Sequence, residues 1–211
     1  MSDKSKILHA IVDFESLSNI PPDQQLVSVG ISTFNEEDFF NGIKAPFSNL
    51  YLVFNRQGQE HLKRNQSTLD WWFGSNQAEL GTLDAFEKAK PGTVSLSAGI
   101  NAICGYMNDL GQQGYEVHVW GNGATFDVSP IELACNHLSL HHPWDFRNVR
   151  DMRTLKDITH RFFGMKEQIK KAVPENFQPH NALSDSYHQG LLVMESLVLL
   201  QRLAKSAGIG Q

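Results

Sequence analysis

The sequence predicts an α/β fold in which a mixed sheet is flanked by helices. Three strand-like runs follow one another near the N-terminus, at 6–14, 26–34 and 47–54, with only short turn-like or acidic loops between them. This arrangement is typical of an antiparallel meander. From Gly58 the apolar period changes to a helical one, and a short alternating run at 116–120 interrupts the helices. We therefore expect parallel strands beside the meander and one domain over 1–211.

The first run, Lys6 to Phe14, has the unbroken apolar character of a strand that is buried on both faces. Asp13 and Glu15 break that character at its carboxyl end. Residues two apart in a strand share a face, so the two carboxylates should point the same way. The alternative is a surface turn with two solvated acids. In the second run, Gly30 indicates a position that another segment approaches closely.

A short helix is predicted around 69–73, with Ser67 as its N-cap. Its adjacent tryptophans, Trp71 and Trp72, face directions about 100° apart. One could stack on a nucleobase while the other enters the core, although core packing for both remains open. Two longer helices follow at 77–90 and 95–110, separated by Pro91-Gly92.

The strand at 116–120 ends in Gly121-Asn122-Gly123, which predicts a tight turn. The turn lacks the Lys-Ser/Thr of a phosphate-binding loop, so we expect it to bring its backbone and Asp127 near a substrate. Asp127 should begin a helix that runs towards residue 137. A further helix should open at Asp151 and continue to 163, followed by a flexible basic stretch that contains Pro174.

The last apolar segment predicts a buried helix over 185–205. With Ser184 as N-cap, Asp185 lies in its first turn, and His180 lies on the loop before it. Asp185 should therefore be held rigidly, while the loop leaves His180 free to approach a substrate.

Composition places the chain among ordinary globular proteins: 41% of residues are hydrophobic, 19% are charged, and the net charge is −5. We expect a cytoplasmic protein without a membrane segment. The two cysteines are too few for a disulfide framework. The segment 147–171 holds eight basic and three acidic residues, a local charge of +5 that leaves −10 for the rest. It is either a solvated helical face or a contact for nucleic acid.

Three aspartates, one glutamate and one histidine at these sites suit metal-assisted phosphodiester hydrolysis. Carboxylate oxygens favour Mg²⁺ or Mn²⁺ over Zn²⁺. A zinc hydrolase with histidine ligands is an alternative, since His188 stands three residues after Asp185 and the pair could bind a transition metal.

Together these motifs resemble the DEDDh 3′–5′ exonucleases. The resemblance rests on Asp13-Phe14-Glu15, on Asp127 after Trp-Gly-Asn-Gly-Ala-Thr-Phe, and on His180 with Asp185, and it spans nearly the whole chain. Within that superfamily the chain looks most like the branch of T-even phage exonuclease A and a mycobacterial exoribonuclease. The details are the paired tryptophans and the run that begins at Asp151. The chain departs from the common pattern at 16–17, where many members have Thr-Gly, and at 184, where an acidic residue is common.

The resemblance implies a ribonuclease H-like fold and two divalent ions, Mg²⁺ or Mn²⁺, held by Asp13, Glu15, Asp127 and Asp185. It implies that His180 is the general base, and the reference pKa of histidine, about 6.5, suits that role at neutral pH.

The implied partner is the 3′ end of DNA or RNA, single-stranded or with a 3′ overhang, from which nucleoside 5′-monophosphates are released. Homodimerisation stays open, as does a non-catalytic nucleic-acid-binding module of the same fold. The residues expected to contact the substrate are Phe14, Leu17, Trp71, Trp72, Asn122 and Arg153.

Overall fold

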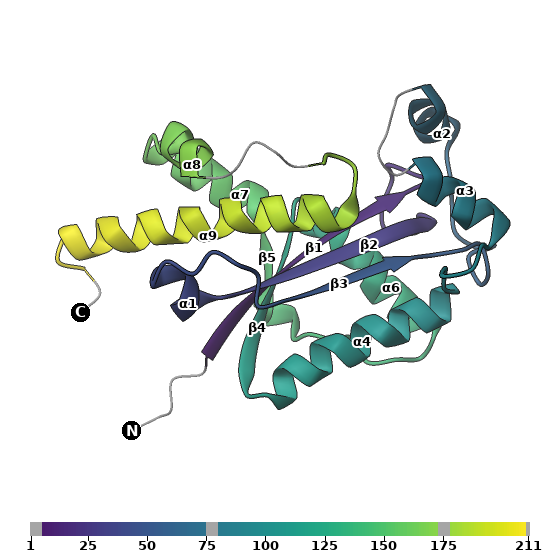
Figure 1. Cartoon of the computed structure of the whole chain (residues 1–211), viewed down its shortest axis with the longest axis horizontal. Helices are drawn as coiled ribbons and strands as arrows, with labels where there is room; N and C mark the ends of the chain where they lie inside the picture. The colour runs from purple at the N-terminus through teal and green to yellow at the C-terminus, as the bar shows by residue number, and fades with distance from the viewer. Residues whose placement is uncertain (1–5, 75–79, 173–177, 210–211) are drawn as a thin grey trace.

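A computed structural model describes residues 6–74, 80–172 and 178–209 and contains the expected mixed sheet (Figure 1). Its five strands are β1 (Lys6–Ser16), β2 (Leu26–Asn35), β3 (Ser48–Val53), β4 (Tyr115–Gly121) and β5 (Val149–Asp151). They lie in the order β3-β2-β1-β4-β5. The pairs β1–β2 and β2–β3 are antiparallel, whereas β1–β4 and β4–β5 are parallel. The predicted meander and the parallel strands beside it are confirmed.

Helices cover both faces of the sheet (Figure 1). On one face lie α4 (Leu96–Gln112), which Ser95 caps, and α6 (Ser129–His137), over a core that includes Leu8, Ala10 and Val12 of β1. On the other face lie α1 (Glu36–Phe40), α7 (Met152–Asp157) and the long α9 (Ala182–Ser206), over a second core around Ile11 and Trp120. Alternate residues of β1 thus feed two cores, and Asp13 shares the α9 face with Ile11.

Several local predictions were wrong. The acidic loop after β2 forms α1, and the three-residue β5 was not foreseen. Part of the stretch predicted to be flexible forms α8 (Lys166–Ala172), whereas Pro174 lies outside the described residues.

The cap of α2 (Gln66–Gly74) is Asn65, not Ser67, because the Asn65 side chain accepts from the Thr68 N–H at 2.9 Å. The next helix is α3 (Leu80–Lys88); the predicted start at Gln77 lies outside the described residues. A π-helical turn, Ile158–Phe162, continues α7 and brings the helical segment close to its predicted end at 163.

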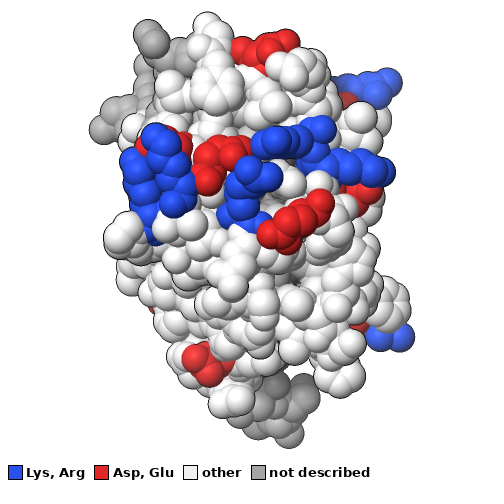
Figure 2. Space-filling view, turned by 90° about the vertical axis from the view of Figure 1, so that its right-hand side faces the viewer, with Lys and Arg blue, Asp and Glu red and all other residues white. Residues whose placement is uncertain are grey.

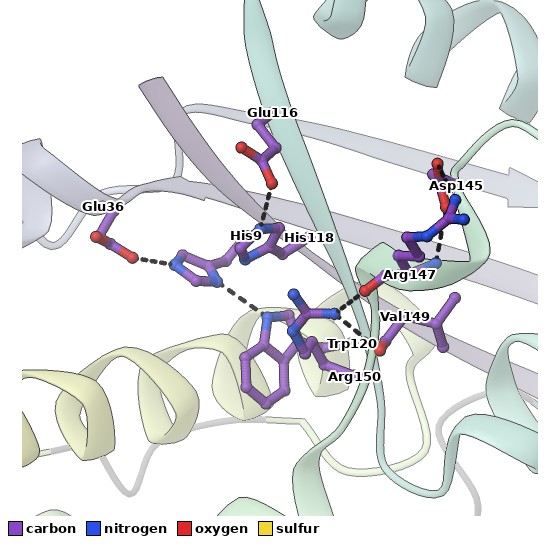
Figure 3. Close-up of polar contacts among 9 residues, drawn as sticks. All are labelled: His9, Glu36, Glu116, His118, Trp120, Asp145, Arg147, Val149 and Arg150. Atoms are coloured by element: carbon purple, nitrogen blue, oxygen red, sulfur yellow. Dashed lines mark hydrogen bonds and ion pairs between the residues drawn. The ribbon is translucent and has the colours of Figure 1, made fainter. Parts of the chain in front are cut away.

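A buried histidine links the sheet to α1 (Figure 3). His9 Nδ1 accepts from the Trp120 indole N–H at 3.0 Å, so its Nε2 carries the proton and donates to Glu36 at 2.8 Å. Burial lowers the pKa of His9, and the hydrogen bond from His9 lowers the pKa of Glu36. The sequence does not reveal this network, because its members lie far apart in the chain.

The side of the molecule that carries α2 and α3 mixes charges of both signs. Figure 2 shows its Lys and Arg side chains in a band beside Asp and Glu, with few charges below that band. Ion pairs near α3 join Arg56 and Arg64 to Glu87, and Lys88 and Lys90 to Asp84. Within the described ranges, no helix is long and apolar enough to cross a membrane.

Candidate active site

Three carboxylates meet where the carboxyl end of β1 faces the first turn of α9. Asp13, Glu15 and Asp185 each offer an oxygen, and these oxygens all lie within 4.8 Å of one another. The pairing of β1 with β2 shifts register just after Glu15, and such irregularities re-aim side chains at the end of a strand. The strand therefore supplies two carboxylates on one face, as predicted, and the helix supplies the third.

A glycine lets α9 come this close to the sheet. Gly30 of β2 lies opposite Asp13, and a Cβ built on it would stand 2.3 Å from the Ala182 carbonyl group and 2.4 Å from Leu183 N. Only a residue without a side chain fits there. The predicted close approach at Gly30 is confirmed, and it places the first turn of α9 directly over the end of β1.

The start of α9 is capped one turn earlier than predicted. The side chain of Asn181 accepts from the Ser184 N–H at 3.0 Å, so Asn181 is the N-cap rather than Ser184. Asp185 still lies in the first turn, near the positive end of the helix dipole. The residue before the cap, His180, has a left-handed backbone with φ of 58°.

The glycine turn after β4 delivers the fourth carboxylate. Gly123 has φ of 105°, and α5 (Ala124–Asp127) begins after it, so Asp127 ends a short helix rather than opening a long one. Asp151 fixes this turn by accepting from the Ala124 N–H at 2.8 Å and from the Thr154 N–H at 3.1 Å. Asp127 is 3% exposed, and in the described part of the chain its Oδ2 has no hydrogen-bond partner.

Burial and mutual repulsion act on the carboxylates of the cluster. Burial, then the charges of Asp127, Glu15 and Asp185, raise the pKa of Asp13 well above its ordinary value. Burial also raises the pKa of Asp127 to about 7, although the Asn122 N–H and Arg153 act in the opposite direction. Carboxylates crowded in this way bind cations well, because a cation relieves both the repulsion and the desolvation.

A pocket of about 290 Å³ joins the four carboxylates to most of the predicted site residues. Its lining consists of Asp13, Phe14, Glu15, Asn122, Phe126, Asp127, Arg153, His180, Asp185 and Gln189. Gln189 was not predicted. Its Nε2 donates to Asp13 Oδ1 at 2.7 Å, and its position one turn after Asp185 could have revealed it, since residues four apart share a helix face.

A second pocket, of about 360 Å³, adjoins the first and is more aromatic. Phe14 and Phe126 line both pockets and stack on each other with ring centroids 5.6 Å apart. Trp71 is 42% exposed in this second pocket, and its ring meets the His180 ring edge to face at 4.8 Å. Phe126 was missed, although it immediately precedes Asp127 in the motif.

Two predicted substrate contacts are core residues. Leu17 is fully buried and lines neither pocket, which argues against the contact expected of it. Trp72 is 1% exposed, and its indole N–H donates to the Ser16 carbonyl at 3.1 Å. It also belongs to the lining of the aromatic pocket, so its contact with a substrate stays a prediction. Core packing for both tryptophans is therefore excluded: both line the aromatic pocket, but Trp72 is buried in the core, whereas Trp71 is exposed.

The donor set fits hard divalent cations. Carboxylate oxygens are the ligands that Mg²⁺ and Mn²⁺ prefer, and Asp127 presents an unused buried oxygen beside the three clustered residues. Among the described residues, no group of three or more possible ligands includes His188, so the alternative zinc site gains no support.

The comparisons with known proteins agree with this geometry. Residues 8–197 match the model of the Rv2179c-like 3′–5′ exoribonuclease domain. The chain belongs to this family. The family is a 3′–5′ exoribonuclease domain, which supports an enzyme over the alternative of a non-catalytic nucleic-acid-binding module. A search of curated proteins gives no match.

Solved structures of similar fold include DEDDh nucleases. The nuclease domain of 3′hExo, a DEDDh family member bound to rAMP, has 12% identity and a TM-score of 0.57, over 95% of this chain and 94% of that one. A 3′-exonuclease structure concerned with recognition of the histone mRNA stem-loop has 12% identity and a TM-score of 0.56, over 95% and 84% of the two chains. At this identity the likeness establishes the ribonuclease H-like fold.

Proposed function

We propose that this member of the family is a divalent-metal-dependent 3′–5′ exonuclease that removes nucleoside 5′-monophosphates from the 3′ end of DNA or RNA. The observation that carries the proposal is the cluster of Asp13, Glu15 and Asp185 with the buried, unpartnered oxygen of Asp127 beside it.

In this proposal Asp13, Glu15, Asp127 and Asp185 hold two ions, Mg²⁺ or Mn²⁺. Bound there, the ions supply positive charge that stabilises the attacking and leaving oxygens of the phosphodiester. The chain contributes the positions of the ligands. Asp185 is fixed by the tight contact of α9 with Gly30, and Asp13 by the hydrogen bond from Gln189.

His180 is the proposed general base, which takes the proton from the attacking water. It lines the pocket of the carboxylates but belongs to the loop before α9. Its ring contacts the ring of Trp71, which lines the aromatic pocket, edge to face. Arg153, also in the pocket lining, is the proposed ligand of a phosphate oxygen.

The aromatic pocket is the proposed place of the terminal base. Phe126 and Trp71 offer ring surface for stacking, which tolerates every base because each has a π-face. The polar groups at its rim, Ser18, Asn19, Ser67 and Thr68, are the candidates for contacts with the sugar. In this position the 5′ phosphate of the terminal nucleotide lies next to the carboxylates, so cleavage there yields a nucleoside 5′-monophosphate.

A direct test uses matched DNA and RNA strands labelled at the 5′ end, single-stranded and with 3′ overhangs. With Mg²⁺ or Mn²⁺ the protein should shorten one or both stepwise from the 3′ end, and a chelator should stop the reaction. Asp13→Asn should abolish cleavage. His180→Ala should lower kcat by about 10²–10⁴-fold with little change in binding, whereas His141→Ala, an exposed loop histidine, should not. Full activity of His180→Ala would refute the assignment of the base.

A further inference from the structure

A row of basic side chains leads away from the pocket along α7 and the turn that follows it. Arg153, Lys156 and His160 are three and four residues apart, which places them on one side of the helical segment. Arg153 is at the near end, in the lining of the carboxylate pocket. At about 1.5 Å per residue the three positions extend over roughly 10 Å.

Electrostatic interactions indicate that the side chains follow one another in space. The pKa of Lys156 is lowered by burial and then by the charge of Arg153. The pKa of His160 is lowered by partial burial and then by the charges of Lys166 and Lys156. Lys166 begins α8, so the row continues from α7 onto the next helix. Both helices contact α9.

The cations of this row are not neutralised in the way that other basic residues are. Near α3 the basic residues form ion pairs with Glu87 and Asp84. Within the described ranges no ion pair is found for Arg153, Lys156 or Lys166. Asp127 and Asp151 offset part of the charge of Arg153 and Lys156, although no ion pair joins them within the described ranges. An anionic partner would relieve the repulsion that remains between the like charges.

We propose that Arg153, Lys156, His160 and Lys166 form a track that binds the phosphates of a nucleic acid strand upstream of its 3′ end. The inference rests on the proposed function, because the track begins at the carboxylate pocket. That pocket repels a polyanion, so a strand needs compensating positive charge close by, and this row supplies it. The track also distinguishes a long strand from a dinucleotide, which is too short to reach Lys166.

The test compares the double variant Lys156→Gln/Lys166→Gln with the control Lys6→Gln/Lys205→Gln, which removes the same charge from exposed positions elsewhere. For each protein, kcat/KM is measured on a dinucleotide and on a single strand of 20 nucleotides. The track variant should lose about tenfold on the long strand at low salt and almost nothing on the dinucleotide. Its slope of log(kcat/KM) against log salt should be shallower by about 1.4, or about 0.7 for each phosphate that the protein no longer neutralises. The control should behave like the wild type.

Equal losses on both substrates, or no loss on the long strand, would overturn the track. Lys156 is partly buried, so the exposed Lys166→Gln is measured alone as well, with about half the change in slope. Binding of a fluorescent 20-mer is measured in parallel with a chelator present. If the wild type cuts neither substrate but binds the 20-mer, and the track variant alone binds it more weakly, the proposed function fails while the track stands. If both variants bind alike, the track fails.

Discussion

Replacement of Gly30 by Ala tests whether the contact between β2 and α9 sets the geometry of the site. The new Cβ would stand 2.3 Å from the Ala182 backbone, whereas ordinary contacts begin near 3.4 Å. The first turn of α9 must therefore retreat by about 1 Å, and Asp185 moves with it. Such overpacking costs about 1–3 kcal/mol of stability, or roughly 2–12 °C in Tm for a chain of this size.

The effect on activity should exceed the effect on folding. Metal–ligand distances tolerate about 0.2 Å, and a displacement of 1 Å at a reacting centre can cost about 10²-fold in rate. We expect Gly30→Ala to need far more Mg²⁺ for half-maximal cleavage and to lose about 10²-fold in kcat at temperatures where it is folded. Gly105→Ala is the control: Gly105 lies exposed in α4, with nothing within 4 Å of its added Cβ. If Gly30→Ala is as active as this control at equal Mg²⁺, the reasoning about α9 is wrong.

Three further predictions use other parts of the structure. Asp127→Asn should abolish cleavage yet raise the free energy of unfolding of the metal-free protein at pH 8. The reason is the raised pKa of Asp127, through which the wild type loses stability as pH rises from about 4 through about 7. A metal-free stability lower than that of the wild type would contradict this. For His9 the sign is opposite, since its pKa is lowered in the folded state: stability should fall as pH drops below 6.5, and denaturant unfolding of His9→Gln should show a flatter pH profile. Trp71→Ala should lower kcat/KM by about tenfold, as expected when one base no longer stacks, while Trp71→Phe should retain most of it; equal losses in both would exclude a role for the ring face.

The parts of the fold that the sequence predicted are those with long, regular patterns. The run of buried residues before Asp13 is sufficient to define β1, and the apolar residues of α9 define a buried helix. In contrast, β5 has three residues and α1 has five, too few for a period to be recognised. Their existence depends on pairing with β4 and on the contact of Glu36 with His9, which are tertiary interactions.

Helix starts were predicted less well than helices. At α2 and at α9 the sequence offers two capping residues within a few positions, and in both cases the earlier one, an asparagine, is the cap. Ser184 instead accepts from the Gln178 N–H and so ties the loop of His180 back onto α9. Propensity alone cannot choose between such neighbours, because the choice depends on where the chain leaves the helix.

The site itself was predictable residue by residue only where chemistry demands a particular side chain. All four carboxylates and His180 line or adjoin one pocket as expected, because few other residue types could do their work. Gln189 and Phe126 escaped notice since amides and phenylalanines occur everywhere in proteins. The roles of Leu17 and Trp72 depend on burial, which the sequence around them does not reveal.

The contact between Gly30 and α9 also means that the site is assembled from segments far apart in the chain. Asp13 is supplied by the first strand and Asp185 by the last helix, so a fragment that stops before Ala182 keeps three carboxylates but not the fourth. Catalytic competence should therefore report on the docking of α9 itself. A fragment of residues 1–178 can be mixed with a peptide of residues 179–211 as a split enzyme. The activity that returns then measures the affinity of α9 for the sheet.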